Sequence, residues 1–399
     1  MRYVGYGFLA LLIAYLAIPF SSWLVTLIRA AARAKKGAGP DTDARDPSTR
    51  LLFLVPAHNE AAVIGRCVES LLAQAYPAGM FSVVVVADNC DDDTESVAGG
   101  LGAECLVRHD RDNPGKPQAI AWALAEIGDL SPWDACVIID ADSEVAPDFA
   151  GALASFAPLS NKVLQAYYGI SNPRRSWLTR LARLLGRARY EVEYPLKSRA
   201  DLNCPLTGNG MCIGTEILGK HGWTAFSLTE NWELYADYTA QGIRIELAAE
   251  ARLYALESES LSASRTRRSR WLRGRAHVLR KYGWPIWRST RIGWAQKLDA
   301  IAELATLPPT VHASAAGMLG IGLIATLDAS VGRWLGTVAL LTLVPLATAS
   351  VVSLAKDPEP FKTATALLLL PFYALWRAVL LVETLLLHRE SVWRKTERS

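Results

Sequence analysis

The residues in this sequence that are best suited to chemistry are two aspartates at the end of a short apolar run. The run from Ala135 to Ile139 is rich in β-branched residues, and Asp140 and Asp142 follow it directly. Such a run is typical of a strand buried on both faces. In an extended segment residues i and i+2 point the same way, so both carboxylates can converge on one ligand. They suit Mg²⁺ or Mn²⁺, although a helix cap with a solvated loop is the simpler interpretation.

Two similar units of strand and acid precede this run. The apolar segments 51–56 and 81–87 are followed by Glu60 and Asp88, and helical patterns separate the segments. Strands that alternate with helices predict a parallel α/β sheet with helices on both faces. The carboxyl ends of such strands meet at one edge, which is where ligands bind. We therefore expect the acids of all three units to surround one site.

Apolar residues gather at both ends of the chain, which has 399 residues and is 51% hydrophobic. Segment 5–28 is long enough for a membrane helix, and the basic residues after it predict an anchor with a cytoplasmic C-terminal end. Segments 310–327 and 334–354 are two further predicted membrane helices. A proline and two charged residues interrupt 363–387, which either spans or lies in the interface. The basic tail after 388 is expected in the cytoplasm, so the number of C-terminal spans stays open between two and three.

Charge and cysteine content narrow the class of protein. The net charge of +3 and the lack of a long basic tract argue against nucleic acid as a partner. Six cysteines without a Cys-x-x-Cys pair predict packing residues in a reducing compartment. Segment 174–189 interleaves leucines with arginines, so it predicts a basic helix that either lies on anionic lipid or is simply solvated. Residues 265–275 are the densest basic stretch.

The order of motifs resembles glycosyltransferase family 2, in its membrane-embedded, cellulose- and hyaluronan-synthase-like branch. The stretches that carry the resemblance are Val55–Glu60, Val86–Asp88, Gly115–Lys116, Asp140–Asp142, Thr207–Gly210, Thr229–Asn231 and Arg267–Trp271. The resemblance implies a GT-A nucleotide-sugar-binding α/β domain flanked by transmembrane helices, with a divalent metal and a donor that is usually UDP-linked.

The resemblance also implies roles for individual residues. On the donor side these are Glu60, Asp88, Lys116 and Asp140, and at the Mg²⁺ or Mn²⁺ they are Asp140 and Asp142. On the acceptor side they are Trp271, Gly208 and Asn209. The implied catalytic residues are Glu230, Asp142 and Arg270.

Two positions depart from the family pattern. The family's Thr-Glu-Asp ends in Asn231 here, and an amide cannot act as a base. Either Glu230 or Glu233 takes the proton, or the aligned acid is not the base in this branch. The family's glutamine before Arg-Trp is Arg267, which keeps hydrogen-bond donors but adds charge.

The chemistry of sugar transfer explains why these residue types are needed. Breaking a sugar–diphosphate bond leaves negative charge that a metal and the Arg270 guanidinium could stabilise. The attacking hydroxyl must lose a proton, for which we favour Glu230. A tryptophan such as Trp271 offers an apolar plane to a sugar ring. The simpler alternatives are that Glu230 is a helix N-terminal acid and that Trp271 is a core residue or an interface anchor.

The sequence predicts a membrane-bound inverting glycosyltransferase that transfers from a nucleotide-sugar to a polysaccharide. The alternatives are transfer of one sugar to a lipid acceptor and a non-catalytic nucleotide-sugar-binding subunit. We expect a multi-pass protein of the cell membrane, in contact with the lipid bilayer, with its catalytic domain in the cytoplasm. The predicted parts are an anchor (1–36), a linker (37–50), the GT-A domain (51–275), an interfacial segment (276–307) and a C-terminal membrane region (308–399).

Overall fold

The chain folds into two compact units. The computed structural model describes residues 2–34, 46–306, 308–326 and 331–386. Within those residues, the α/β unit comprises Ala38–Pro173 and Asn203–Ser258. The helical unit comprises Met1–Gly37, Arg174–Leu202 and Glu259–Glu390. The linker predicted at 37–50 and the basic tail lie largely or wholly outside the described residues.

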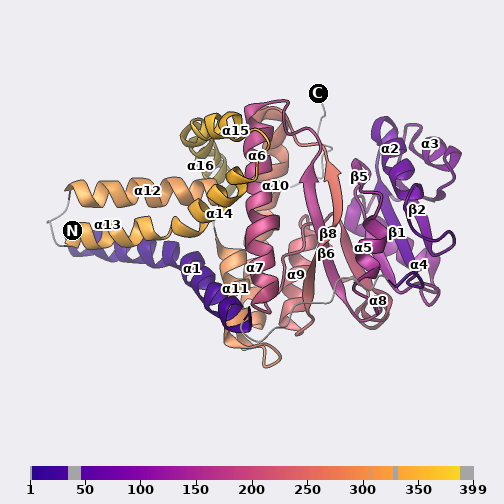
Figure 1. Ribbon diagram of the computed structural model, residues 1–399, viewed down its shortest axis with the longest axis horizontal. Coiled ribbons are helices and arrows are strands. Elements are labelled where there is room, and N and C mark those ends of the chain that lie inside the picture. Colours follow the sequence, from indigo (N-terminus) through magenta and orange to yellow (C-terminus); the bar gives the residue numbers. More distant parts are fainter. Residues whose placement is uncertain (1, 35–45, 307, 327–330, 387–399) are drawn as a thin grey trace. The chain divides into compact units, whose positions relative to one another are not determined.

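The α/β unit is built on one mixed sheet of eight strands (Figure 1). The strands are β1 (Leu51–Ala57), β2 (Phe81–Asp88), β3 (Glu104–Arg108), β4 (Ala135–Ile138), β5 (Ser143–Val145), β6 (Val163–Ile170), β7 (Met211–Gly214) and β8 (Ile245–Ala255). Their order is β3-β2-β1-β4-β7-β6-β8-β5. The strands β3, β2, β1 and β4 are parallel, whereas β7 runs antiparallel to both β4 and β6. The last pairs are β6 with β8, parallel, and β8 with β5, antiparallel.

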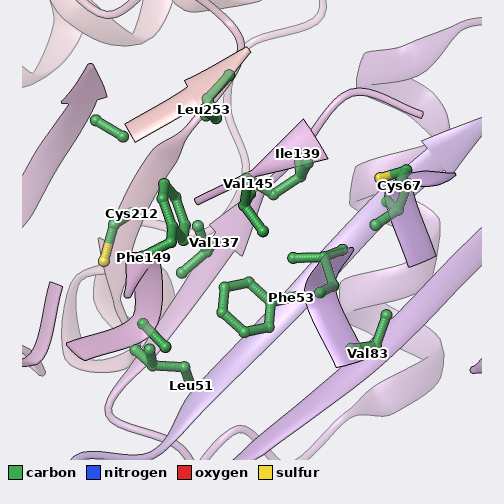
Figure 2. Packing of buried hydrophobic residues seen from close by; sticks show 14 of the residues in the cluster. Leu51, Phe53, Cys67, Val83, Val137, Ile139, Val145, Phe149, Cys212 and Leu253 are labelled. Carbon is green, nitrogen blue, oxygen red and sulfur yellow. The ribbon is translucent and has the colours of Figure 1, made fainter. Parts of the chain in front are cut away.

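Helices accompany this sheet in the α/β unit. They are α2 (Ala61–Leu72), α3 (Thr94–Gly100), α4 (Lys116–Ile127), α5 (Phe149–Ala154), α8 (Thr215–His221) and α9 (Glu230–Ala240). The core between the sheet and these helices is apolar, and Phe53 lies near its centre with Phe149 (Figure 2). Their ring centroids are 6.2 Å apart and both side chains are fully buried. The apolar runs predicted as buried strands are indeed β1, β2 and β4, because only buried strands can hide such runs from water.

The sheet differs from the prediction in two respects. It is mixed rather than wholly parallel, because the short strand β7 enters beside β4 in the opposite direction. In addition, β4 ends at Ile138, and the Ser143 amide donates to the Asp140 carbonyl across 3.0 Å. This i to i+3 bond forms a turn. The paired aspartates therefore lie in a tight β4–β5 turn, and the prediction that they extend a straight strand was wrong.

The helical unit contains the remaining helices. They are α1 (Arg2–Ala34), α6 (Trp177–Arg187), the π-helix η1 (Ala188–Glu193), α7 (Tyr194–Arg199), α10 (Leu261–Arg288), α11 (Trp294–Ala305), α12 (Pro309–Thr326), α13 (Val331–Leu341), α14 (Val344–Ala355), α15 (Pro360–Leu367) and α16 (Leu370–Leu386). The predicted basic helix is α6, which begins at a Ser176 cap whose side chain accepts from the Thr179 amide. Its leucines pack inward and its arginines reach the loop after α14.

Length and composition mark one helix of the described chain as able to cross a bilayer, the 13–34 part of α1. Up to four crossings result if each of three bent helix pairs counts as one span. Two predicted helices are such pairs: α13 and α14 meet at 42°, and α15 and α16 meet at 49°. Prolines at the starts of α14 and α16 account for the breaks, because proline cannot donate the bond that continues a helix.

Close packing of glycines joins α12 to α13. A Cβ on Gly336 would lie 2.6 Å from the Gly320 carbonyl oxygen, and one on Gly320 would lie 2.7 Å from the Leu340 side chain. Small residues allow helix backbones to approach in this way, and such contacts are typical of helix pairs in membranes.

We expect Gly336→Ala to destabilise the full chain by about 1–3 kcal/mol, because the added methyl group meets a backbone oxygen. Gly317→Ala is the matched control, since a Cβ there meets nothing within 4 Å and alanine favours the helix. Thermal unfolding of both variants in the same detergent measures the difference. Equal midpoints for both variants would show that the helices are not in close contact.

Candidate active site

The carboxyl ends of β1 and β2 are held together by a network of loop hydrogen bonds. The His58 ring nitrogen Nδ1 lies 2.7 Å from the Asp88 carbonyl oxygen, so the histidine links the loop after β1 to the end of β2. Asn59 and Asn89 follow the two strands with φ of 55° and 52°. Asparagine tolerates this left-handed region better than other non-glycine residues. The Asn59 side-chain oxygen accepts from the backbone amide of Asp91 at 2.7 Å. This hydrogen bond joins the loop after β1 to the loop after β2.

Glu60 lies just beyond this turn, at the start of α2. Its backbone amide donates to the Thr94 hydroxyl at 2.8 Å. The residue is half-buried at the same strand edge as Asp88. The structure therefore places Glu60 just after β1 and Asp88 at the end of the neighbouring strand β2, while their contacts with a nucleotide stay a prediction.

Asp88 is the centre of a buried ion-pair network. Its Oδ1 accepts from Arg108 Nη1 at 2.6 Å and from the side-chain nitrogen Nδ2 of Asn89 at 3.0 Å. Its Oδ2 accepts from the Gly115 backbone amide at 3.3 Å. Arg108 also pairs with Asp110 at 2.6 Å. With both oxygens bonded to protein groups, Asp88 holds the 109–115 loop in place as well as facing the strand edge.

Sequence reasoning missed Arg108 as a member of this site. It is only 5% exposed, and β2 and β3 align Asp88 opposite Arg108. A buried arginine needs a paired acid. The signal in the sequence was an arginine at the end of one short apolar strand and an aspartate at the end of the strand before it. It could be recognised only once the pairing of β2 with β3 was known.

Lys116 links the donor side of the site to α9. It follows Gly115, whose φ of 128° is one that side-chain-bearing residues rarely adopt. The Lys116 ammonium lies 2.5 Å from Asp140 Oδ1 and 3.5 Å from Glu230 Oε1. It also donates to the Gly208 carbonyl. One cation thus contacts the β4–β5 turn, the loop before β7 and the start of α9.

The protonation of Lys116 follows from these neighbours. Burial alone would lower the pKa of its ammonium, but the carboxylates of Asp140 and Glu230 outweigh burial and raise that pKa above its ordinary value. Lys116 is therefore charged throughout the neutral range. A change of pH within the neutral range therefore does not release the two acids from Lys116.

The Gly208–Asn209 segment supports the β4–β5 turn. Asn209 is 3% exposed, its side-chain oxygen accepts from the Asp140 amide at 3.1 Å, and its nitrogen donates to the Ser143 hydroxyl at 2.7 Å. A Cβ on Gly208 would lie 3.4 Å from Glu230 Oε1. Both residues therefore shape the site, whereas their predicted contact with an acceptor stays a prediction.

The three polar residues at the start of α9 have different environments. The Asn231 side chain donates to the Leu206 carbonyl at 2.8 Å. The Glu233 carboxylate is buried and accepts from the backbone amide of Ser227, in the segment before α9, at 2.9 Å. The Glu230 carboxylate contacts Lys116, so the structure brings this candidate base to the predicted donor residues.

The remaining predicted residues, Arg270 and Trp271, lie on α10 in the helical unit. Trp271 is 39% exposed, and the Arg267 guanidinium carbon lies 5.2 Å from its ring centroid. Arg267 thus stacks on the tryptophan, an arrangement that a glutamine at this position would not provide. The roles of Arg270 and Trp271 stay predictions.

The predicted metal ligands form a partial shell. Among the described residues there is no group of three or more His, Cys, Asp or Glu side chains that could hold a metal. Asp140 and Asp142 offer two hard oxygen donors in one turn, which fits an ion that takes its other ligands from phosphate and water. The residues present therefore fit a divalent metal that binds together with a diphosphate.

The mixed sheet, with acids at the ends of its parallel strands and a cation among them, defines an α/β fold of the glycosyltransferase type. Residues 47–274, more than half of the chain, match the model of "Glycosyltransferase like family 2". The chain belongs to this family. The family is thus as predicted, and the cellulose- and hyaluronan-synthase-like branch stays a prediction.

Curated relatives and a solved structure agree with this family. The chain is 24% identical over 266 residues to a β-monoglucosyldiacylglycerol synthase of Synechocystis sp., covering 65% of this chain and 54% of that one. It is 23% identical over 244 residues to the probable glycosyltransferase YdaM of Bacillus subtilis, covering 58% and 57%. The chain thus spans about half the length of these curated relatives. The mannosyltransferase PcManGT of Pyrobaculum calidifontis, solved with GDP-Man and Mn²⁺, shares the fold with a TM-score of 0.55 and 20% identity over 95% of this chain and 99% of that chain.

We expect Arg108→Met to destabilise the α/β unit by about 3–5 kcal/mol, because it leaves the buried Asp88 carboxylate unpaired. The matched control is Arg111→Met, which breaks an exposed pair with Asp91 worth at most about 1 kcal/mol. Urea unfolding followed by far-ultraviolet circular dichroism measures both. A loss as small for Arg108 as for Arg111 would show that the Asp88 pair is not structural.

Proposed function

We propose that this glycosyltransferase moves one sugar from a nucleotide-sugar donor to a lipid acceptor at a membrane, with inversion at the anomeric carbon. The observation that carries the proposal is the Lys116 bridge, which joins the predicted donor residue Asp140 to the candidate base Glu230. The named activity of the synthase relative, a glucosyldiacylglycerol synthase, supports a lipid acceptor. The 13–34 candidate span supports the membrane location.

On the acceptor side, Glu230 would remove the proton of the attacking hydroxyl. Its side chain is 10% exposed, so few waters compete with the acceptor for the carboxylate. The hydroxyl oxygen forms the new bond to the anomeric carbon while the bond from that carbon to the diphosphate oxygen breaks. The proton passes to a Glu230 oxygen, and the electron pair of the broken bond leaves with the diphosphate.

On the donor side, positive charge must meet the departing diphosphate. Lys116 lies between the two acids and is charged at neutral pH, so it can turn toward phosphate oxygens when a donor enters. Arg270 is the second predicted cation for this role. A Mg²⁺ or Mn²⁺ held by Asp140 and Asp142 would neutralise diphosphate charge.

Transfer to a polysaccharide, which the sequence predicts, is the second candidate function. A channel for a growing polymer needs several membrane helices, whereas the described chain offers one to four candidate spans. The small number favours the lipid acceptor. The non-catalytic alternative rested on Asn231. Membership of the family and the contact of Glu230 with Lys116 favour an enzyme instead.

We expect Glu230→Gln to lower turnover at least 1,000-fold while donor binding stays within about threefold, because the amide keeps its shape but cannot accept the proton. Glu233→Gln is the control, since that side chain serves the Ser227 amide and should lose less than about tenfold. Initial rates and equilibrium binding of UDP measure the two effects. A Glu233 variant that is inactive beside an active Glu230 variant would exchange their roles.

We expect membranes that contain the full chain to release nucleoside diphosphate from one donor in a panel of UDP- and GDP-sugars, with Mn²⁺ or Mg²⁺ present and not with a chelator. Thin-layer chromatography and mass analysis should then find a single lipid-soluble product one sugar heavier than diacylglycerol or another supplied lipid. A ladder of polymer masses would instead establish the polysaccharide acceptor.

A further inference from the structure

Arg377 is a buried cation in the helical unit. Its burial is not explained by a role in sugar transfer. It lies in the middle of α16 and is only 6% exposed. Two of its guanidinium nitrogens, Nε and Nη1, are buried without a hydrogen-bond partner in the described chain. Burying a guanidinium without an anion is costly. The position therefore indicates a ligand that carries negative charge.

The surroundings of Arg377 add positive charge. Tyr373, one turn earlier on α16, stacks on Arg268, whose guanidinium carbon lies 5.5 Å from the ring centroid. Arg268 and Arg275 both act electrostatically on Arg377. The nearby acid of α16, Glu383, is already paired with Arg265 at 2.5 Å. This face of α16 and α10 therefore combines several cations with a carboxylate that is already engaged.

The contacts of α16 with α10 indicate how α16 would lie in a membrane. Tyr373 near its start contacts Arg268, and Thr384 near its end lies 3.4 Å from the Ser269 hydroxyl. Eleven residues of helix separate these ends by about 16 Å, yet both meet neighbouring residues of α10. That part of α10 is rich in arginines, which are costly in a hydrocarbon core and belong at its surface. With those arginines at the surface, both ends of α16 would lie at the level of the lipid headgroups.

The opposite face of α16, with the turn that precedes it, is apolar and exposed. The exposed residues recur at helical spacing and are Leu368, Phe372, Leu375, Val379 and Val382, with exposures from 49% to 79%. A helix with one apolar face and one charged face lies along a bilayer surface with the apolar face in lipid. Lys362 on the adjoining α15, with its side chain 68% exposed, is already paired with Glu359 at 2.9 Å. A lipid surface that carries negative charge therefore fits the exposed apolar face of α16 and the cations on its opposite face.

We propose that Arg377, with Arg268 beside it, binds the phosphate group of a membrane lipid where α16 lies along the bilayer surface. The proposal rests on the proposed membrane location and not on sugar transfer. A phosphate diester offers oxygens to the planar guanidinium and neutralises the cations around it. With α16 along the surface, the bent pairs α11–α12 and α13–α14 are left as the candidate crossings of the C-terminal part of the described chain.

The test uses the full chain, purified in detergent and stripped of lipid, with a short-chain phosphatidic acid as the probe. Isothermal titration should give an affinity at least tenfold weaker for Arg377→Met than for the unchanged chain. Lys362→Met, which removes an exposed charge of the same region, should bind within about twofold of the unchanged chain. Diacylglycerol of the same chain length should not bind at this site in any of the three proteins.

Three outcomes would overturn the proposal. Equal phosphatidic acid binding by Arg377→Met would remove Arg377 from the site, and equally tight binding of inorganic phosphate would make it a site for free phosphate. A lower unfolding temperature of Arg377→Met without lipid would indicate a structural role, because loss of an unpaired buried charge should not destabilise the protein. Arg377→Lys, which keeps the charge, should recover some of the binding. None of these readouts needs a donor, so failure of sugar transfer would leave the lipid site standing.

Discussion

The contacts of the Lys116 ammonium are the interaction on which the site depends. Asp140 and Glu230 come from segments 90 residues apart in the sequence, and both carry negative charge. Without a cation between them, the buried carboxylate of Glu230 and the half-buried carboxylate of Asp140 would repel each other. The Lys116 ammonium contacts both carboxylates and so offsets their repulsion. It also donates a hydrogen bond to the backbone carbonyl of Gly208. The turn that should hold metal and diphosphate and the helix that should hold the base therefore have one position relative to each other.

The ion pair of Asp88 with Arg108 has a similar role behind the site. It holds the loop that ends at Gly115, and that glycine begins α4 with Lys116 as its first residue. The helical unit also pairs buried charges of opposite sign, as in the contact of Lys197 with Asp299 at 2.8 Å. Against that background Arg377 is conspicuous, because among the described residues its buried nitrogens have no such partner. A buried charge that the described residues leave unpaired can be neutralised by a bound anion.

Much of the fold followed from the sequence where burial dictates composition. The strands β1, β2 and β4 were predicted almost to the residue, since apolar runs of that length must be hidden. The later strands were not, because β5 and β7 have three or four residues and β6 and β8 mix polar and apolar positions. The turn at Asp140 was taken for an extended strand, since the bond that closes it involves only backbone atoms. The order of the motifs predicted the family, but it could not decide whether Glu230 or Glu233 is the base. The two acids differ in the groups they contact, which are Lys116 for Glu230 and the Ser227 amide for Glu233.

Our central claim is that Lys116 and Glu230 act as one unit in sugar transfer. A double-mutant cycle on kcat/KM tests it most directly, with Lys116→Met, Glu230→Gln and the variant that carries both changes. Residues that act as a unit give non-additive losses. We predict that the double variant is no slower than the slower single variant, within about threefold. Losses that multiply, so that the double variant is slower by the product of the two single effects, would show that the two residues act independently and would contradict the claim.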